Sequence, residues 1–221
     1  MKEYSKTNLA PNIALSTPLF KQQLNFISSL APPNDSRTGF LRLSDGKPPY
    51  PFFKLNTDGS ALDNPGLARA GSVLQDHQGQ WISRFSAHVG LATNNLAELA
   101  VIRQGLAMAW NMGVKLLQLE LDSKVVLNWL TNTNMNYPTN ILPLICDCRN
   151  LLDQEWEVRI QHVYREANGC ADTLAKRGTH HRNLMTMYNE CPTFVYVSYM
   201  RDLTGLGETR LCTPSTVVGV V

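Results

Sequence analysis

The hydrophobic residues of this chain change their spacing near residue 93, and that change restricts the fold more than any other feature. Before it, segments 52–60, 68–76 and 80–89 alternate apolar and polar residues, as half-buried strands do. After it, apolar residues from Leu99 to Ala109 recur every three or four positions, which predicts an amphipathic helix. Three strands followed by a helix predict an antiparallel meander that continues into βαβ crossovers.

Strand and helix patterns then alternate as far as residue 178. Strands are predicted at 115–121 and 156–164, where apolar residues again alternate. Further helices are predicted at 122–130, 140–152 and 168–178 from capping residues and apolar spacing. The order βββαβααβα predicts an α/β fold in which helices flank a mixed five-stranded sheet.

One folded domain, residues 52–180, is expected between two segments whose composition and apolar spacing differ from its own. Residues 1–51 are rich in Pro, Ser and Asn and keep no apolar period, which predicts a poorly ordered linker or a remnant of something larger. Residues 181–221 form a C-terminal extension in which the pattern fades. Within this extension, Thr193–Tyr199 is expected to pair as an edge strand.

Composition excludes several classes of protein. No apolar run approaches the roughly 18 residues of a membrane span, so no membrane partner is expected. The five Cys form no CxxC pair, which argues against a zinc site or a disulfide framework and favours a reducing compartment, nucleus or cytoplasm. Residues 53–178 hold eleven Lys and Arg against twelve Asp and Glu, so tight non-specific binding to nucleic acid is not predicted. A monomer is expected.

Four carboxylates lie at or near junctions between predicted elements: Asp58, Glu98, Asp122 and Asp172. If they converged without a cation, each pair at about 4 Å would repel by roughly 4 kcal/mol at an effective dielectric of 20. A hard divalent ion removes that repulsion, and Mg²⁺ prefers carboxylates, water and phosphates. Two such ions would hold the attacking water and the leaving oxygen of a phosphodiester. Solvated turn or cap carboxylates are the alternative reading.

Four local motifs carry a resemblance to a known family. In order along the chain they are T-D-G-S-A-L-D-N-P-G (57–66), T-N-N-L-A-E-L (93–99), L-E-L-D-S (119–123) and H-V-Y-R-E-A-N-G-C-A-D-T-L-A (162–175). They resemble the four blocks of type 1 ribonuclease H over residues 53–178. The last block is typical of the ribonuclease H domains of plant non-LTR retrotransposons.

The resemblance implies a ribonuclease H-like fold and an endonuclease that cuts the RNA strand of an RNA·DNA hybrid, leaving a 5′-phosphate and a 3′-hydroxyl. It implies two Mg²⁺ ions, with Mn²⁺ as a substitute, and relatives that carry a reverse transcriptase domain. The residues that match the family's catalytic, metal-binding carboxylates are Asp58, Glu98, Asp122 and Asp172.

The same resemblance assigns a set of substrate-binding positions. Ser60, Asn64 and Asn95 match polar positions that touch the minor groove of the hybrid, where 2′-hydroxyl groups are displayed. Gly59 would let the backbone approach the substrate closely. Turn formation is the competing role for Ser60 and Asn64, and Asn95 also serves as an early helix residue.

Two departures from the family pattern leave alternatives open. His162 lies ten residues before Asp172, as a catalytic histidine of many relatives does, yet V-R-I-Q-H-V-Y reads as an uninterrupted strand. Residues 131–140 are too short and too uncharged to be the basic element with which bacterial enzymes grip the hybrid. Weak substrate affinity follows, and the alternative function is a catalytically silent, domesticated module that binds nucleic acid or protein.

Overall fold

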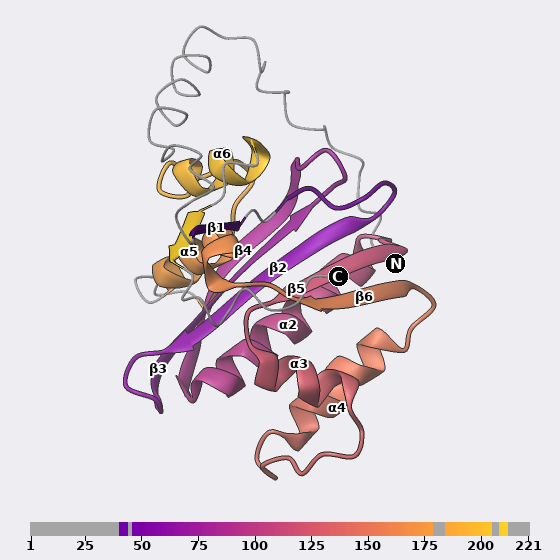
Figure 1. Ribbon diagram of the computed structural model, residues 1–221. Coiled ribbons are helices and arrows are strands. Elements are labelled where there is room, and N and C mark those ends of the chain that lie inside the picture. The colour runs from indigo at the N-terminus through magenta and orange to yellow at the C-terminus, as the bar shows by residue number, and fades with distance from the viewer. Residues whose placement is uncertain (1–39, 44–45, 179–183, 205–207, 212–221) are drawn as a thin grey trace, which may run out of the picture. The chain divides into compact units, whose positions relative to one another are not determined.

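A mixed sheet forms the centre of the computed structural model, which describes residues 40–43, 46–178, 184–204 and 208–211 (Figure 1). Strands β2 (Phe53–Ala61), β3 (Gly66–Gln75) and β4 (Trp81–Ala92) form the predicted antiparallel meander. β5 (Leu116–Leu121) pairs in parallel with β2, and β6 (Glu157–His162) pairs in parallel with β5. The predicted α/β class and the mixed sheet are confirmed.

The sheet has a sixth strand that the sequence analysis did not predict. β7 (Met185–Met187) pairs with β4 and gives the order β6-β5-β2-β3-β4-β7. The predicted edge strand at Thr193–Tyr199 is wrong, because this segment is a turn that leads into helix α6 (Tyr196–Thr204). Its β-branched and aromatic residues suggested a strand, but Val195 and Tyr199, four residues apart, pack into one cluster, and the Tyr199 amide donates to the Val195 carbonyl as in a helix.

The helices lie where capping residues and apolar spacing predicted them. They are α2 (Asn94–Asn111), α3 (Lys124–Thr131), α4 (Leu142–Leu152) and α5 (Gly169–Gly178), with a short 3₁₀ turn at Arg165–Ala167 before the last one. Thr93 caps α2 through the amide of Leu96, and Ser123 caps α3 through the amide of Val126. Within the described ranges, no helix is long and apolar enough to cross a membrane.

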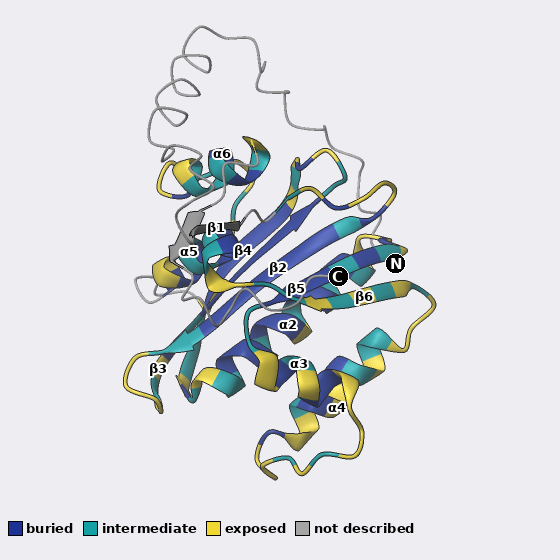
Figure 2. Cartoon of the chain, in the orientation of Figure 1, coloured by how far each residue is buried: buried dark blue, intermediate teal, exposed yellow. Residues whose placement is uncertain are grey.

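The main core lies between the sheet and the three helices on one face (Figure 2). The apolar stripe of α2, which includes Leu99, Ile102 and Leu106, packs against fully buried leucines of β2, β3 and β5. On the opposite face α5 lies directly on β3, because a Cβ on Gly71 would come within 2.3 Å of the backbone at Ala171. Since Gly71 is the ladder partner of Asp58, this contact places α5 beside the carboxylate of Asp58.

A buried ion pair fastens the C-terminal extension to the sheet. Lys54 Nζ on β2 lies 3.5 Å from Asp202 Oδ1 on α6, and their side chains are 1% and 6% exposed. Gln75 of β3 donates a second hydrogen bond to the Asp202 carboxylate, and Lys54 also donates to the carbonyl of Gly46. The described part of the extension is therefore packed against the domain. A separate two-stranded sheet joins β1 (Phe40–Leu43) to β8 (Glu208–Leu211).

We expect Asp202→Asn to lower the free energy of unfolding by about 2–4 kcal/mol, because the buried Lys54 ammonium then loses its opposite charge. Urea denaturation of the whole chain measures this loss. Asp147→Asn is the matched control, since it removes the same charge from the exposed ion pair with Arg103 and is expected to cost less than about 1 kcal/mol. Equal losses in the two variants would contradict the structural role given to Asp202.

Candidate active site

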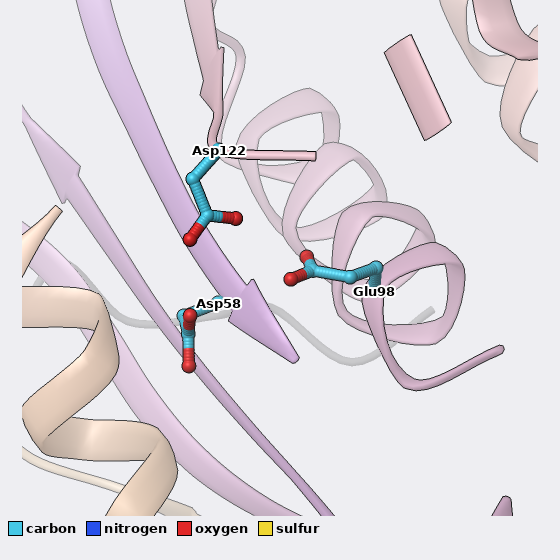
Figure 3. Close-up of side chains that lie close together, drawn as sticks. All are labelled: Asp58, Glu98 and Asp122. Carbon is cyan, nitrogen blue, oxygen red and sulfur yellow. The ribbon is translucent and has the colours of Figure 1, made fainter. Parts of the chain in front are cut away.

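Three of the four predicted carboxylates come together at one point. Asp58 lies on β2, Glu98 on α2, and Asp122 directly after β5. One oxygen atom from each lies within 4.8 Å of the other two, and Figure 3 shows the three side chains converging from their separate elements. Asp58 and Glu98 are buried, with 2% and 6% exposure, and Asp122 is half-buried.

The pairing of the strands places two of these carboxylates side by side. Asn56 of β2 is in register with Glu120 of β5 in a parallel ladder, so Asp58 and Asp122, each two residues further on, lie on the same face. The buried Glu120 carboxylate accepts hydrogen bonds from the amides of Asn56, Gln118 and Gln161, which hold the two central strands and β6 together beside the site.

A glycine on β2 brings the third carboxylate to the same point. A Cβ on Gly59 would lie 2.4 Å from the carbonyl carbon of Ala97 and 2.5 Å from the amide nitrogen of Glu98. The first turns of α2 therefore touch the backbone of β2, and the Gly59 amide donates a hydrogen bond to the Glu98 carboxylate. Gly59 was expected to approach the substrate, whereas its close approach in the structure is to α2.

Two asparagines tie the turn after β2 to the start of α2. Asn64 Oδ1 accepts a hydrogen bond of 2.9 Å from the amide of Asn94, and Asn94 Oδ1 accepts one of 2.7 Å from the amide of Ala61. This reciprocal pair fixes Asp58 relative to Glu98. Of the two roles open to Asn64 from the sequence, substrate contact and turn formation, the structure shows a contact that holds the turn. Asn95 lies in the first turn of α2 and is half-buried.

Burial and mutual repulsion raise the pKa values of the three clustered carboxylates. Loss of solvent is the largest cause for each group. The pKa of Asp58 rises to about 7, because the charges of Asp122 and Asp172 add to its burial. The pKa of Glu98 rises well above its ordinary value, and that of Asp122 rises although the nearby Arg165 opposes the change. Without a cation, the site favours protonated carboxyl groups.

Asp172 stands outside the group of three. It lies in the first turn of α5, where Arg165 Nη2 is 3.1 Å from Oδ1 and Lys176 Nζ contacts Oδ2. Its charge nevertheless contributes to the raised pKa of Asp58, so the carboxylate lies near the cluster. Arg165 is seven residues before Asp172 and contacts it across the start of α5, a pairing that no sequence pattern predicted.

His162 and Asn168 lie in the same region. His162 is the last residue of β6, half-buried, and its Nε2 lies 3.2 Å from the backbone oxygen of Asp122. It is therefore both a strand residue, as its alternating pattern predicted, and a neighbour of the cluster. Asn168 is fully buried and donates a 2.8 Å hydrogen bond to the carbonyl of Thr57, which anchors the start of α5 to β2.

The cluster fits a divalent cation by the chemistry of its donors. All three ligand atoms are carboxylate oxygens, which suits Mg²⁺ or Mn²⁺ better than zinc. Oδ2 of Asp58 and Oε2 of Glu98 are buried and accept no hydrogen bond from any residue that the structure describes. Because buried oxygens without a partner are costly, a cation at this point would satisfy both and relieve the repulsion.

Comparison with known proteins assigns the family. The family model described as "Reverse transcriptase-like" matches residues 56–178, more than half of the chain, and includes all four predicted carboxylates. The chain belongs to this family. An Arabidopsis thaliana relative named "Putative ribonuclease H protein" is 43% identical over 125 residues, which cover 56% of this chain and 20% of that protein.

Two further relatives have solved structures. Ribonuclease HI of Halobacterium salinarum is 32% identical over 118 residues, 53% of this chain and 59% of that protein. Its crystal structure superposes with a TM-score of 0.55 over 58% of this chain and 98% of the solved one. A second solved structure is the N-terminal RNase H domain of a Mycobacterium tuberculosis protein, fused to maltose binding protein. It superposes with a TM-score of 0.56 and 26% identity over 58% of this chain and 94% of the solved chain. The domain is ribonuclease H-like.

In metal-free buffer, we expect stability to fall as the pH rises from about 4 to about 8. The three carboxyl groups titrate at higher pH in the folded chain than in the unfolded chain, so the folded state holds more protons in that range. Asp58→Asn should raise the free energy of unfolding at pH 8 by about 1–3 kcal/mol and flatten this dependence.

Urea denaturation in EDTA at several pH values measures both effects. The exposed Asp153→Asn, which makes the same change in charge, is the control and should follow the wild type. A wild-type chain that gains stability between pH 5 and pH 8 would contradict the prediction.

Proposed function

We propose that this domain hydrolyses the RNA strand of RNA·DNA hybrids with two bound Mg²⁺ ions. The single observation that carries the proposal is the convergence of Asp58, Glu98 and Asp122 within 4.8 Å from three separate elements. Support also comes from relatives that are named as ribonuclease H, although this chain spans only 20% of the Arabidopsis protein and 59% of the archaeal one.

Each carboxylate has a distinct part in this proposal. Asp58, which is close to Glu98 and Asp122 and feels the charge of Asp172, would contribute to both metal sites, and Glu98 and Asp122 would complete them. Asp172 becomes a ligand only if its bonds to Arg165 and Lys176 are exchanged for a metal. When bound, Mg²⁺ would lower the pKa of the attacking water and would stabilise negative charge on the leaving oxygen.

Substrate recognition is proposed for the polar residues around the cluster. Asn95 is half-buried in the first turn of α2, three residues before Glu98, and we assign it a contact with a 2′-hydroxyl group in the minor groove. The Asn64 side-chain oxygen is already bonded to Asn94, so its contribution is to hold the turn and to offer its amide nitrogen. Ser60 Oγ accepts a hydrogen bond from Arg69 Nε, so its own hydroxyl proton can still be donated to the substrate.

A catalytically silent binding module is the second candidate, and two observations favour it. Both oxygens of Asp172 are engaged by cationic side chains. The 131–140 segment is held by Arg149, which donates to the Asn132 carbonyl and to the Tyr137 hydroxyl, and it presents no basic side chain. Such a module would bind nucleic acid without cutting it.

We expect the purified chain to cleave the RNA strand of a labelled hybrid in Mg²⁺, and Asp58→Asn to reduce the rate by more than about 100-fold. EDTA should abolish cleavage, and the products should carry 5′-phosphate and 3′-hydroxyl ends. Because Asp58→Asn is expected to stabilise the metal-free fold, a loss of activity cannot be attributed to unfolding. Duplex DNA of the same sequence is the substrate control, and Asp153→Asn is the protein control. Hybrid binding without cleavage would support the silent module instead.

A further inference from the structure

A short basic row crosses the sheet beside the carboxylate cluster. In the ladders of the meander, Ser60 of β2 is paired with Arg69 of β3, and Arg69 is paired with His88 of β4. Directly paired residues point to the same face of a sheet, so these three side chains share one face. Asp58 lies on that face as well, since it is two residues before Ser60 on the same strand.

The guanidinium of Arg69 is oriented but not neutralised. Its Nε donates a 3.1 Å hydrogen bond to Ser60 Oγ, and among the described residues it forms no ion pair with a carboxylate. Arg69 and His88 are both half-buried. The positive charge of Arg69 acts on Asp58, whose pKa it lowers against the stronger effect of burial.

The row is bounded on its outer side by apolar residues. Leu67 of β3 and Leu91 of β4 form a cross-strand pair two positions before Arg69 on β3, past a shift in register between Ala68 and Arg69, and are 51% and 81% exposed. The basic side chains, Arg69 and His88, therefore form one cross-strand pair, with the carboxylates on one side and exposed leucines on the other. This geometry suits contact with one phosphate group rather than with an extended stretch of backbone.

We infer that Arg69, oriented by Ser60 and flanked by His88, is a binding site for one backbone phosphate of a nucleic-acid duplex held across the carboxylate cluster. The inference rests on the proposed function and adds to it the side of the sheet along which the duplex runs. A fixed guanidinium with two free terminal nitrogens donates two hydrogen bonds to a phosphate. This contact supplies part of the affinity that the uncharged 131–140 segment lacks.

The test measures binding of the full chain to a fluorescent RNA·DNA hybrid, and to duplex DNA of the same sequence, in Ca²⁺ at several salt concentrations. We expect Arg69→Gln to weaken binding to both duplexes by about tenfold. The slope of log Kd against log salt should fall by about 1, because one phosphate contact is lost. Arg69→Lys keeps the positive charge, so it should keep the wild-type salt slope and lose less affinity than Arg69→Gln. Ser60→Ala, which leaves Arg69 in place, should behave in the same way. In cleavage assays with Mg²⁺, the KM of Arg69→Gln should rise with little change in kcat.

Arg103→Gln is the matched control, because it removes the same charge from α2, where Arg103 is paired with Asp147. If Arg69→Gln binds like this control with an unchanged salt slope while the wild type cleaves the hybrid, the phosphate site is wrong and the proposed function stands. If binding depends on Arg69 but the wild type does not cleave, the proposed function fails and the site stands. A wild type that binds neither duplex overturns both.

Discussion

The repulsion among three carboxylates is the constraint that the rest of this structure must withstand. Asp58, Glu98 and Asp122 lie within 4.8 Å of one another, two of them almost completely buried, so in the absence of a cation each disfavours ionisation of the others. A core of interlocked leucines between the sheet and α2 compensates for this unfavourable arrangement. A site of this kind is destabilising by itself and becomes favourable only when it binds a cation, which is why it points to function.

Two glycines make that arrangement geometrically feasible. Gly59 lets α2 touch β2 on one face of the sheet, and Gly71 lets α5 touch β3 on the other. The two strands are thus held between helices at nearly backbone contact, and the carboxylates of α2 and α5 approach Asp58 from opposite sides. Side chains at either glycine would push a helix outward and separate the ligands. Side-chain hydrogen bonds hold these elements in place. Asn64 and Asn94 link the turn after β2 to α2, and Asn168 links the start of α5 to β2.

The charges around the cluster are organised in two layers. The inner layer is acidic, and the outer layer holds Arg165, Lys176 and Arg69. Arg165 and Lys176 are already paired with Asp172, whereas Arg69 is held by a neutral hydroxyl. This difference separates cations that balance the protein's own carboxylates from one that remains able to meet an external anion. An acidic centre with a cation at its edge is the charge pattern that a bound metal and a polyanionic substrate require together.

The sequence by itself determined the order of elements between residues 52 and 178, the α/β class, the family and three residues that meet at the site. Period-two segments, helical spacing and capping residues are local properties, so they could be read without knowing the fold. Only the tertiary structure decided that Gly59 faces α2, that Asp172 is engaged by Arg165 and Lys176, and that Thr193–Tyr199 leads into a helix rather than pairing as a strand. It also decided that Ser60, Arg69 and His88 form one row. These features depend on strand register and on which backbones pack together, which are contacts between distant residues that local sequence patterns do not encode.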